Sequence, residues 1–168
     1  VWKDLPGVDG RKHSLADLEK EVVVVAFTCN TCPYAIDYEN RLNQLAKRYA
    51  AADSRVAVVA INCNLIEEDS LPEMKRRAAA KKFAFAYLSD VSQESGKQFG
   101  ATRTPEFFVL NKKRKIVYMG ALDDAVDAEK AKINYVQLAI DAALRGERPA
   151  KTETVPIGCN IRYKRSRR

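Results

Sequence analysis

The chain has 168 residues, of which 46% are hydrophobic and 30% are charged, values typical of a globular protein with one sizeable core. No apolar stretch approaches the roughly 20 residues that a membrane-crossing helix needs, so we expect no membrane span in this chain. The net charge is +7, and removing the five positive charges of residues 162–168 leaves +2. No nucleic-acid motif accompanies this basic end, so we expect a solvated terminus and no nucleic-acid partner.

Residues 1–20 precede the first core strand, and we expect them to form an N-terminal extension. Asp9-Gly10 is a turn dipeptide that predicts a short hairpin, and Ser14 is placed to cap a helical turn after it. Because the chain begins at Val1 and not at a methionine, we expect a processed or truncated product whose leader is not visible.

The core begins at residues 21–27, where four consecutive valines predict a strand buried on both faces. Helical spacing of apolar residues follows over 33–51, and a second apolar run at 55–61 predicts a neighbouring parallel strand. The same patterns predict the later elements: a helix at 70–82, a strand at 84–88, a helix at 92–99, a hairpin of strands 106–110 and 115–120, a helix at 131–145 with Ile133, Val136, Ile140 and Leu144 on one face, and a strand around Ile161.

This alternation of strands and helices, ending in a hairpin, predicts an α/β fold with a mixed central sheet and helices on both of its faces. We expect one domain over residues 1–148, which includes the N-terminal extension, and a C-terminal tail over 149–168 with a basic end. The parallel strands at 21–27 and 55–61 end on one rim of the sheet, where open α/β sheets usually place their chemistry.

Two cysteines, Cys29 and Cys32, lie between the first core strand and the first helix. The N-terminus of a helix favours an anion, so we expect this position to lower the pKa of the Cys29 thiol below the free value of about 8.5. The spacing also lets the two sulfurs close a small disulfide ring. Together these features predict a thiol–disulfide exchange centre.

The same two cysteines have other interpretations. They are half of a zinc site if Cys63 and Cys159 supply the remaining ligands, but those two lack the paired spacing of zinc ribbons. They can also be inert core residues. We therefore expect a redox pair and no metal.

Cys63 and Cys159 are possible accessory thiols. Cys63 follows the strand at 55–61, on the same rim as Cys29 and Cys32, and it is either a third redox thiol or a small buried apolar residue. Cys159 lies in the tail, which can fold back over that rim. A Cys63–Cys159 disulfide that holds the tail is one possible pairing.

Several motifs carry a family resemblance. The run Phe27-Thr28-Cys29-Asn30-Thr31-Cys32-Pro33, with Thr104-Pro105 before a β-hairpin, resembles the thioredoxin fold. More narrowly, the chain resembles the redoxin branch that groups alkyl hydroperoxide reductase with extracytoplasmic disulfide reductases. Residues 5–15 resemble the N-terminal extension of that branch, and 120–124 and 157–161 resemble motifs of its uncharacterised members.

The resemblance implies a thioredoxin-like three-layer fold and a thiol–disulfide oxidoreductase that exchanges a Cys29–Cys32 disulfide with protein thiols. It implies that Cys29 is the attacking nucleophile and Cys32 the buried resolving thiol. It also implies a cis Pro105, and a substrate groove in which the backbone of Thr104 pairs with the substrate chain as an added strand.

The resemblance further implies a monomer without organic cofactor or metal. Its partners are a protein disulfide or dithiol substrate and an unidentified redox partner. We expect an extracytoplasmic location, periplasmic or secreted, rather than a cytoplasmic one.

The chain departs from thioredoxin at two positions. Thr28 stands where thioredoxin has a tryptophan, and Val23 lies near the position of its buried acid. A non-catalytic redoxin-like binding module is therefore the leading alternative. A thiol peroxidase fits less well, because its site needs Pro and Thr or Ser seven and three residues before the reactive cysteine, and neither cysteine has them. Asp123-Asp124 is interpreted as a turn cap, with a cation site as the alternative.

Overall fold

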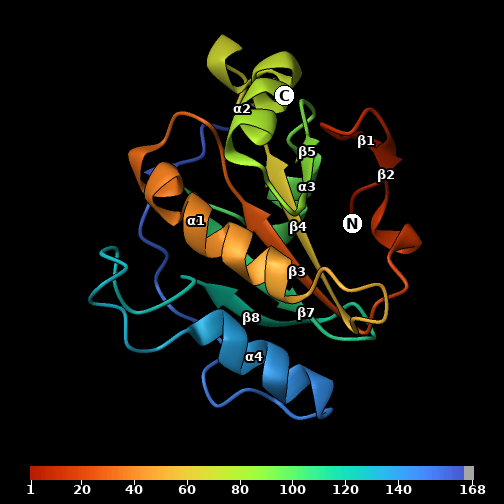
Figure 1. The fold of residues 1–168 in the computed structure, drawn as a ribbon, viewed down its shortest axis with the longest axis vertical. Coiled ribbons are helices and arrows are strands. Elements are labelled where there is room, and N and C mark those ends of the chain that lie inside the picture. The colour runs from red at the N-terminus through yellow and green to blue at the C-terminus, as the bar shows by residue number, and fades with distance from the viewer. Residues whose placement is uncertain (165–168) are drawn as a thin grey trace.

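The computed structural model describes residues 1–164, so the end of the basic tail, 165–168, lies outside the described residues. Its centre is a five-stranded mixed sheet (Figure 1). The spatial order is β5 (Ala86–Ser89), β4 (Val56–Asn62), β3 (Val22–Phe27), β7 (Glu106–Leu110) and β8 (Ile116–Gly120). β3, β4 and β5 are parallel, β7 runs antiparallel to β3, and β8 runs antiparallel to β7 and so in the direction of β3. The predicted mixed sheet with its terminal hairpin is confirmed.

The central strand β3 is buried on both faces, as its run of valines predicts. Val22, Val24 and Ala26 face one half of the core, whereas Val23, Val25 and Phe27 face the other, and all six are 0% exposed. Because side chains alternate along a strand, this one segment joins the two halves of the core.

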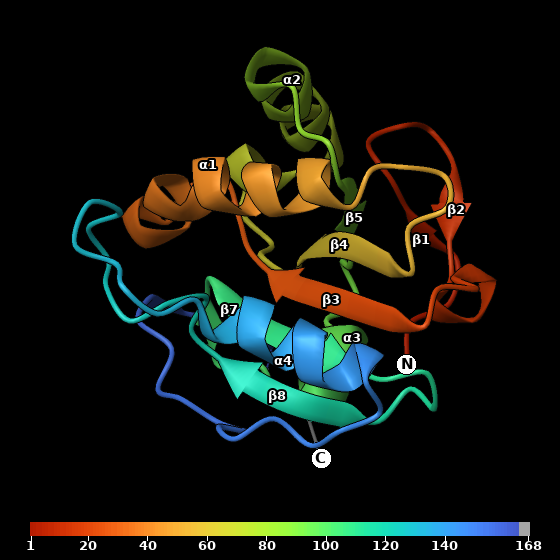
Figure 2. The same cartoon turned by 60° about the horizontal axis from the view of Figure 1, so that its bottom comes forward.

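Three helices cover one face of the sheet, and a shorter one covers the other (Figures 1 and 2). The first face carries α1 (Pro33–Arg48), α2 (Leu71–Lys81) and α4 (Tyr135–Leu144). The second carries α3 (Glu94–Phe99) and the N-terminal extension, in which Trp2 packs against Phe99 with ring centroids 6.1 Å apart. None of the helices within residues 1–164 is long and apolar enough to span a bilayer.

The N-terminal extension forms as predicted. β1 (Leu5–Pro6) pairs with β2 (Lys12–His13) in an antiparallel hairpin. Gly10 in its turn has φ of +81°, a conformation that glycine adopts without steric cost. A short 3-10 helix follows at Leu15–Asp17, capped by Ser14.

The last helix begins later than predicted. Its expected start was near residue 131, but α4 starts at Tyr135 because Asn134 caps it by accepting the backbone N–H of Gln137 at 2.8 Å. Ile133 consequently precedes the helix and is 44% exposed. The polar cap, and not the apolar period, fixes the boundary.

The C-terminal segment returns along the domain after α4. Backbone hydrogen bonds join Met119 of β8 to Thr152 and Thr154 at 3.0 Å each. Further on, β9 (Cys159–Asn160) pairs antiparallel with β6 (Arg103–Thr104), immediately before the predicted position near Ile161. The segment up to residue 164 is therefore packed against the fold.

Candidate active site

The two cysteines of the predicted exchange centre lie at the carboxyl end of β3, in the loop that leads into α1. Cys32 is the N-cap residue of α1 and Pro33 is its first residue, so Cys29 precedes the helix by several positions. Both side chains are buried, with Cys29 2% and Cys32 3% exposed. All four cysteines of the chain are free thiols in this structure.

Thr104 brings the two thiols together from the opposite side of the site. Its hydroxyl oxygen lies 3.4 Å from Cys29 Sγ, and its carbonyl oxygen accepts a hydrogen bond from Cys32 Sγ at 3.0 Å. The peptide bond between Thr104 and Pro105 is cis. The sequence-predicted residues Cys29, Cys32, Thr104 and Pro105 are therefore gathered in one place.

The prediction of a lowered pKa for Cys29 is wrong. Burial raises the pKa of this thiol above its ordinary value; the Thr104 hydroxyl only partly offsets this, and the negative charge of Asp69 adds to the rise. The helix dipole acts within the first turn, and Cys29 lies outside that turn. The thiol expected to ionise easily is thus held in its neutral form.

Cys32 has the opposite environment. Burial opposes its ionisation, but hydrogen bonds from the Cys159 thiol and from the backbone N–H of Ala35 outweigh burial and lower the pKa of Cys32. Ala35 lies in the first turn of α1, so the capping position stabilises a thiolate at Cys32.

A buried carboxylate, Asp69, holds the loop between the cysteines, and sequence reasoning did not identify it. Asp69 Oδ1 accepts the backbone N–H of Asn30 at 2.6 Å, and Asp69 Oδ2 accepts the Thr31 hydroxyl at 2.9 Å. Side-chain amides of Asn62 and Asn64 also donate to it, at 3.2 and 2.9 Å. Its one signal in the sequence was position, because it follows β4 at the rim where the cysteines lie.

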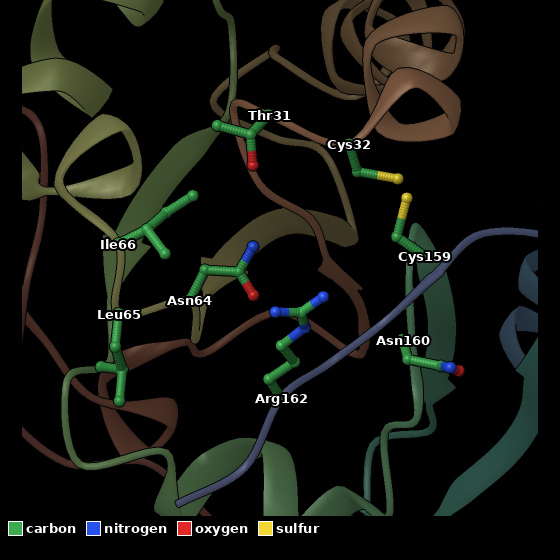
Figure 3. Close-up of a pocket in the computed structure, with 8 residues that line it drawn as sticks. All are labelled: Thr31, Cys32, Asn64, Leu65, Ile66, Cys159, Asn160 and Arg162. Carbon is green, nitrogen blue, oxygen red and sulfur yellow. The ribbon is translucent and has the colours of Figure 1, made fainter.

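Cys159 joins the pair from the C-terminal segment. It packs against the cluster of Cys29, Cys32 and Ala35, and Figure 3 shows its sulfur pointing toward that of Cys32. A cavity of about 480 Å³ opens beside these two thiols. Leu65, Ile66 and Arg162 contribute to its lining, so Cys32 and Cys159 border a space beside the exchange pair.

Cys63 belongs to a different part of the core. Its thiol contacts Asp90 and Ser95, at 3.9 Å each, within the cluster on the other face of the sheet. Burial and the charge of Asp90 raise the pKa of Cys63 to about 12. The structure therefore places Cys63 in a different cluster from Cys159, which it would join in the possible bridge, and from the other cysteines of a four-cysteine zinc site. Within residues 1–164 no group of three or more metal-ligating side chains is arranged to hold a metal ion.

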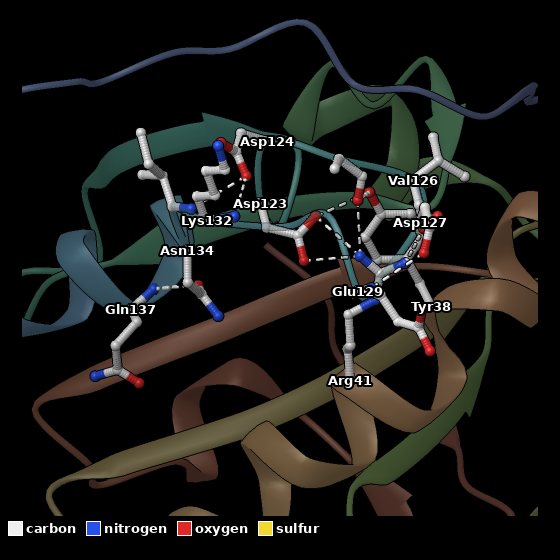
Figure 4. Close-up of polar contacts among 12 residues, drawn as sticks. Tyr38, Arg41, Asp123, Asp124, Val126, Asp127, Glu129, Lys132, Asn134 and Gln137 are labelled. Carbon is white, nitrogen blue, oxygen red and sulfur yellow. Dashed lines mark hydrogen bonds and ion pairs between the residues drawn. The ribbon is translucent and has the colours of Figure 1, made fainter.

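The Asp123-Asp124 pair has structural contacts (Figure 4). Asp124 Oδ1 accepts the backbone N–H groups of Lys132 and Ile133, at 2.8 and 3.1 Å, which is the predicted turn-capping role. Asp123 is buried and forms an ion pair with Arg41 of α1 at 2.8 Å. These contacts anchor the loop that leads to α4.

Comparison with known proteins identifies the family. The AhpC/TSA family matches residues 3–119. The chain belongs to the AhpC/TSA family. No match was found among curated protein sequences.

Two solved structures are similar to this member of the AhpC/TSA family over nearly its full length. An uncharacterised conserved protein from Geobacillus kaustophilus is 34% identical, with a TM-score of 0.88, over 98% of this chain and 90% of that one. A hypothetical protein from Sinorhizobium meliloti 1021 is 33% identical, with a TM-score of 0.87, over 96% of this chain and 91% of that one.

More distant structures establish the thioredoxin-like fold. A thioredoxin-like protein solved in its oxidised form is 14% identical, with a TM-score of 0.65, over 81% of this chain and 86% of that one. The resemblance inferred from the sequence motifs, a thioredoxin-fold redoxin, is thereby confirmed.

Proposed function

We propose that this redoxin is a thiol–disulfide oxidoreductase that exchanges a Cys29–Cys32 disulfide with protein thiols. The observation that supports this best is the contact of both thiols with Thr104, next to the cis peptide bond to Pro105. Neighbours of the same fold include a thiol-disulfide oxidoreductase from Bacteroides fragilis and a secreted disulfide oxidoreductase from Mycobacterium tuberculosis.

The proposed reaction has two exchange steps. A thiolate of the pair attacks one sulfur of a substrate disulfide, forms a mixed disulfide and releases the other substrate sulfur, which takes up a proton. The second cysteine then loses its proton and attacks the mixed disulfide. A Cys29–Cys32 bridge forms and the remaining substrate thiol leaves, so the substrate gains two electrons and the pair loses two.

The structure changes which of the two cysteines we expect to attack the substrate first. The resemblance gives the first attack to Cys29, but the lowered pKa of Cys32 and its place at the cavity favour Cys32. We therefore expect iodoacetamide to alkylate Cys32 faster than Cys29 at neutral pH. Faster alkylation of Cys29 would return the first attack to that residue.

Turnover is tested by insulin reduction with dithiothreitol as electron donor. We expect activity in the wild type, loss to the uncatalysed rate in Cys29→Ser and in Cys32→Ser, and retention in Cys63→Ala, whose thiol lies in the other cluster. Full activity in both serine variants would contradict the proposal.

A binding module without turnover is the second candidate, and one observation favours it. Cys29 and Cys32 are almost fully buried, at 2% and 3% exposed, which leaves little of either sulfur open to an external disulfide. An inactive wild type whose pair nevertheless oxidises and reduces reversibly would favour this candidate.

We also propose the organisation and setting of the protein. Residues 1–148 form the redoxin domain and 149–168 form a segment appended to it. The chain acts as a monomer, without cofactor, on a protein disulfide or dithiol and on a separate redox partner. An extracytoplasmic location is supported by fold neighbours described as an exposed lipoprotein thioredoxin from Streptococcus pneumoniae and as a secreted oxidoreductase.

A further inference from the structure

The C-terminal strand places a third thiol in contact with the exchange pair. β9 pairs antiparallel with β6 in the register that sets Cys159 opposite Thr104, the residue that contacts both Cys29 and Cys32. Cys159 packs against the cluster that contains Cys32, and the sulfurs of these two residues face each other at the cavity (Figure 3).

This placement is fixed by contacts on both sides of Cys159. Before it, a Cβ built on Gly158 would lie 2.2 Å from the carbonyl oxygen of Thr104, so the strand can approach this closely only with glycine there. After it, the backbone N–H of Ile161 donates to the carbonyl of Thr102 at 2.9 Å, and the Tyr163 hydroxyl donates to that of Ala101 at 2.7 Å. Cys159 is therefore held against Cys32.

The charges around Cys159 depend on the state of the pair. Burial is the main cause that raises the pKa of Cys159 to about 11. The interaction of its thiol with Cys32 and the nearby Cys29 add to this rise. In a Cys29–Cys32 disulfide neither sulfur can carry a thiolate charge, and Cys32 no longer offers a thiolate to the Cys159 thiol. The positive charge of Arg103, which acts in the opposite direction, remains. Oxidation of the pair thus makes Cys159 easier to ionise.

We propose that Cys159 is a third catalytic thiol that takes over the disulfide from the Cys29–Cys32 pair. In the exchange, Cys159 loses its proton and its thiolate attacks Cys32 Sγ. A Cys32–Cys159 bond forms, the Cys29–Cys32 bond breaks, and Cys29 leaves as a thiolate that takes up a proton. The number of disulfides is unchanged, so the step needs no further oxidant or reductant. It rests on the proposed function, which supplies the first disulfide.

The product of this exchange faces the cavity. The Cys32–Cys159 disulfide is then accessible to an external dithiol, whereas Cys29 is again a free thiol beside Thr104. We infer that the reductant of this protein acts on the cavity-side bridge and not directly on Cys29.

Peptide mapping after oxidation tests the exchange. The full chain is equilibrated with oxidised and reduced glutathione, quenched with iodoacetamide and digested with trypsin without reduction. Cys29 and Cys32 share the tryptic peptide 21–41, and Cys159 lies in 152–162. We expect a cross-link of these two peptides through Cys32 in the wild type, together with a bridge inside 21–41.

The control variant is Gly158→Ala, which keeps all four cysteines but adds the Cβ that meets Thr104. We expect the cross-link to fall at least tenfold while the bridge inside 21–41 remains. An unchanged cross-link would refute the role of the β6–β9 pairing. A wild type that forms the Cys29–Cys32 bridge but leaves Cys159 fully alkylated would overturn the third-thiol proposal, whatever Gly158→Ala does.

Insulin reduction separates the failure of this proposal from failure of the proposed function. A wild type that reduces insulin but shows no cross-link overturns only the role of Cys159. A wild type that forms neither bridge and reduces no insulin overturns both.

Discussion

Replacement of Asp69 by asparagine is expected to weaken the loop between the two cysteines. Asp69 is 2% exposed, and each of its carboxylate oxygens accepts two hydrogen bonds. Asparagine keeps one oxygen and replaces the other with an NH₂ group, so it loses two of these bonds in either orientation. Hydrogen bonds to a charged group are worth about 1.5–3 kcal/mol each, so the expected loss of unfolding free energy is about 3–6 kcal/mol.

The same substitution is expected to change the chemistry of Cys29. The negative charge of Asp69 contributes to the raised pKa of this thiol, so its removal should lower the pKa of Cys29. Urea denaturation measures the stability, and the pH dependence of iodoacetamide alkylation in a Cys32→Ser background measures the pKa.

Glu68→Gln is the matched control for Asp69→Asn. It removes the same charge one residue earlier, but from an exposed side chain. We expect a change within about 0.5 kcal/mol and no shift in the alkylation profile of Cys29. An Asp69→Asn variant with the unfolding free energy of the wild type and the same pH profile of Cys29 alkylation would refute the anchoring role.

Three further outcomes are expected. Burial raises the pKa of Cys63 to about 12. The folded chain therefore keeps a proton that the unfolded chain loses above about pH 9. Between about pH 9 and about pH 12 the free energy of unfolding falls by about 1.4 kcal/mol per pH unit. Urea titrations at about pH 8 and about pH 10 should therefore show a smaller alkaline loss in Cys63→Ala, and an equal loss in both proteins would count against this. Asp123→Ala leaves the largely buried guanidinium of Arg41 without its counter-charge and should cost about 3–5 kcal/mol in urea denaturation. Asp124→Ala, which removes an exposed capping residue, should cost less. Thr104→Val removes the hydroxyl contact that lowers the pKa of Cys29, so the alkylation profile of Cys29 should move to higher pH, and a move to lower pH would be inconsistent with this contact.

The fold could be predicted from the sequence because its main signals are local. The run of valines in β3, the helical spacing in α1 and the turn residues between β7 and β8 each follow from a pattern within a few residues. The start of α4 was the exception, since the cap at Asn134 overrides an apolar period that continues upstream.

The site was only partly predictable. The motif and its resemblance gave Cys29, Cys32 and Thr104, which the structure gathers together. The pKa order of the two cysteines follows from burial and from the point where α1 begins, and burial is a property of the whole fold. Asp69 acts through its side-chain hydrogen bonds to Asn30 and Thr31, which lie far away in the sequence, and such bonds leave no periodic pattern.

The sequence indicated a strand near Ile161 and a tail that can fold back over the rim, but it did not predict the contact of Cys159 with Cys32. β9 has two residues, too few to show the alternation by which strands are identified. Its register against β6 depends on the close approach of Gly158 to Thr104, a contact between segments far apart in the chain.

The pairing of β9 with β6 has a consequence for competition at the active site. A tethered strand acts like a ligand present at about millimolar effective concentration. Any polypeptide that adds a strand at Thr104 must displace β9. Its apparent dissociation constant is therefore the intrinsic constant divided by the fraction of molecules in which that edge is open. The edge therefore favours partners that also bind strongly elsewhere on the surface, or whose added strand carries a glycine at the position facing Thr104 that Gly158 occupies here.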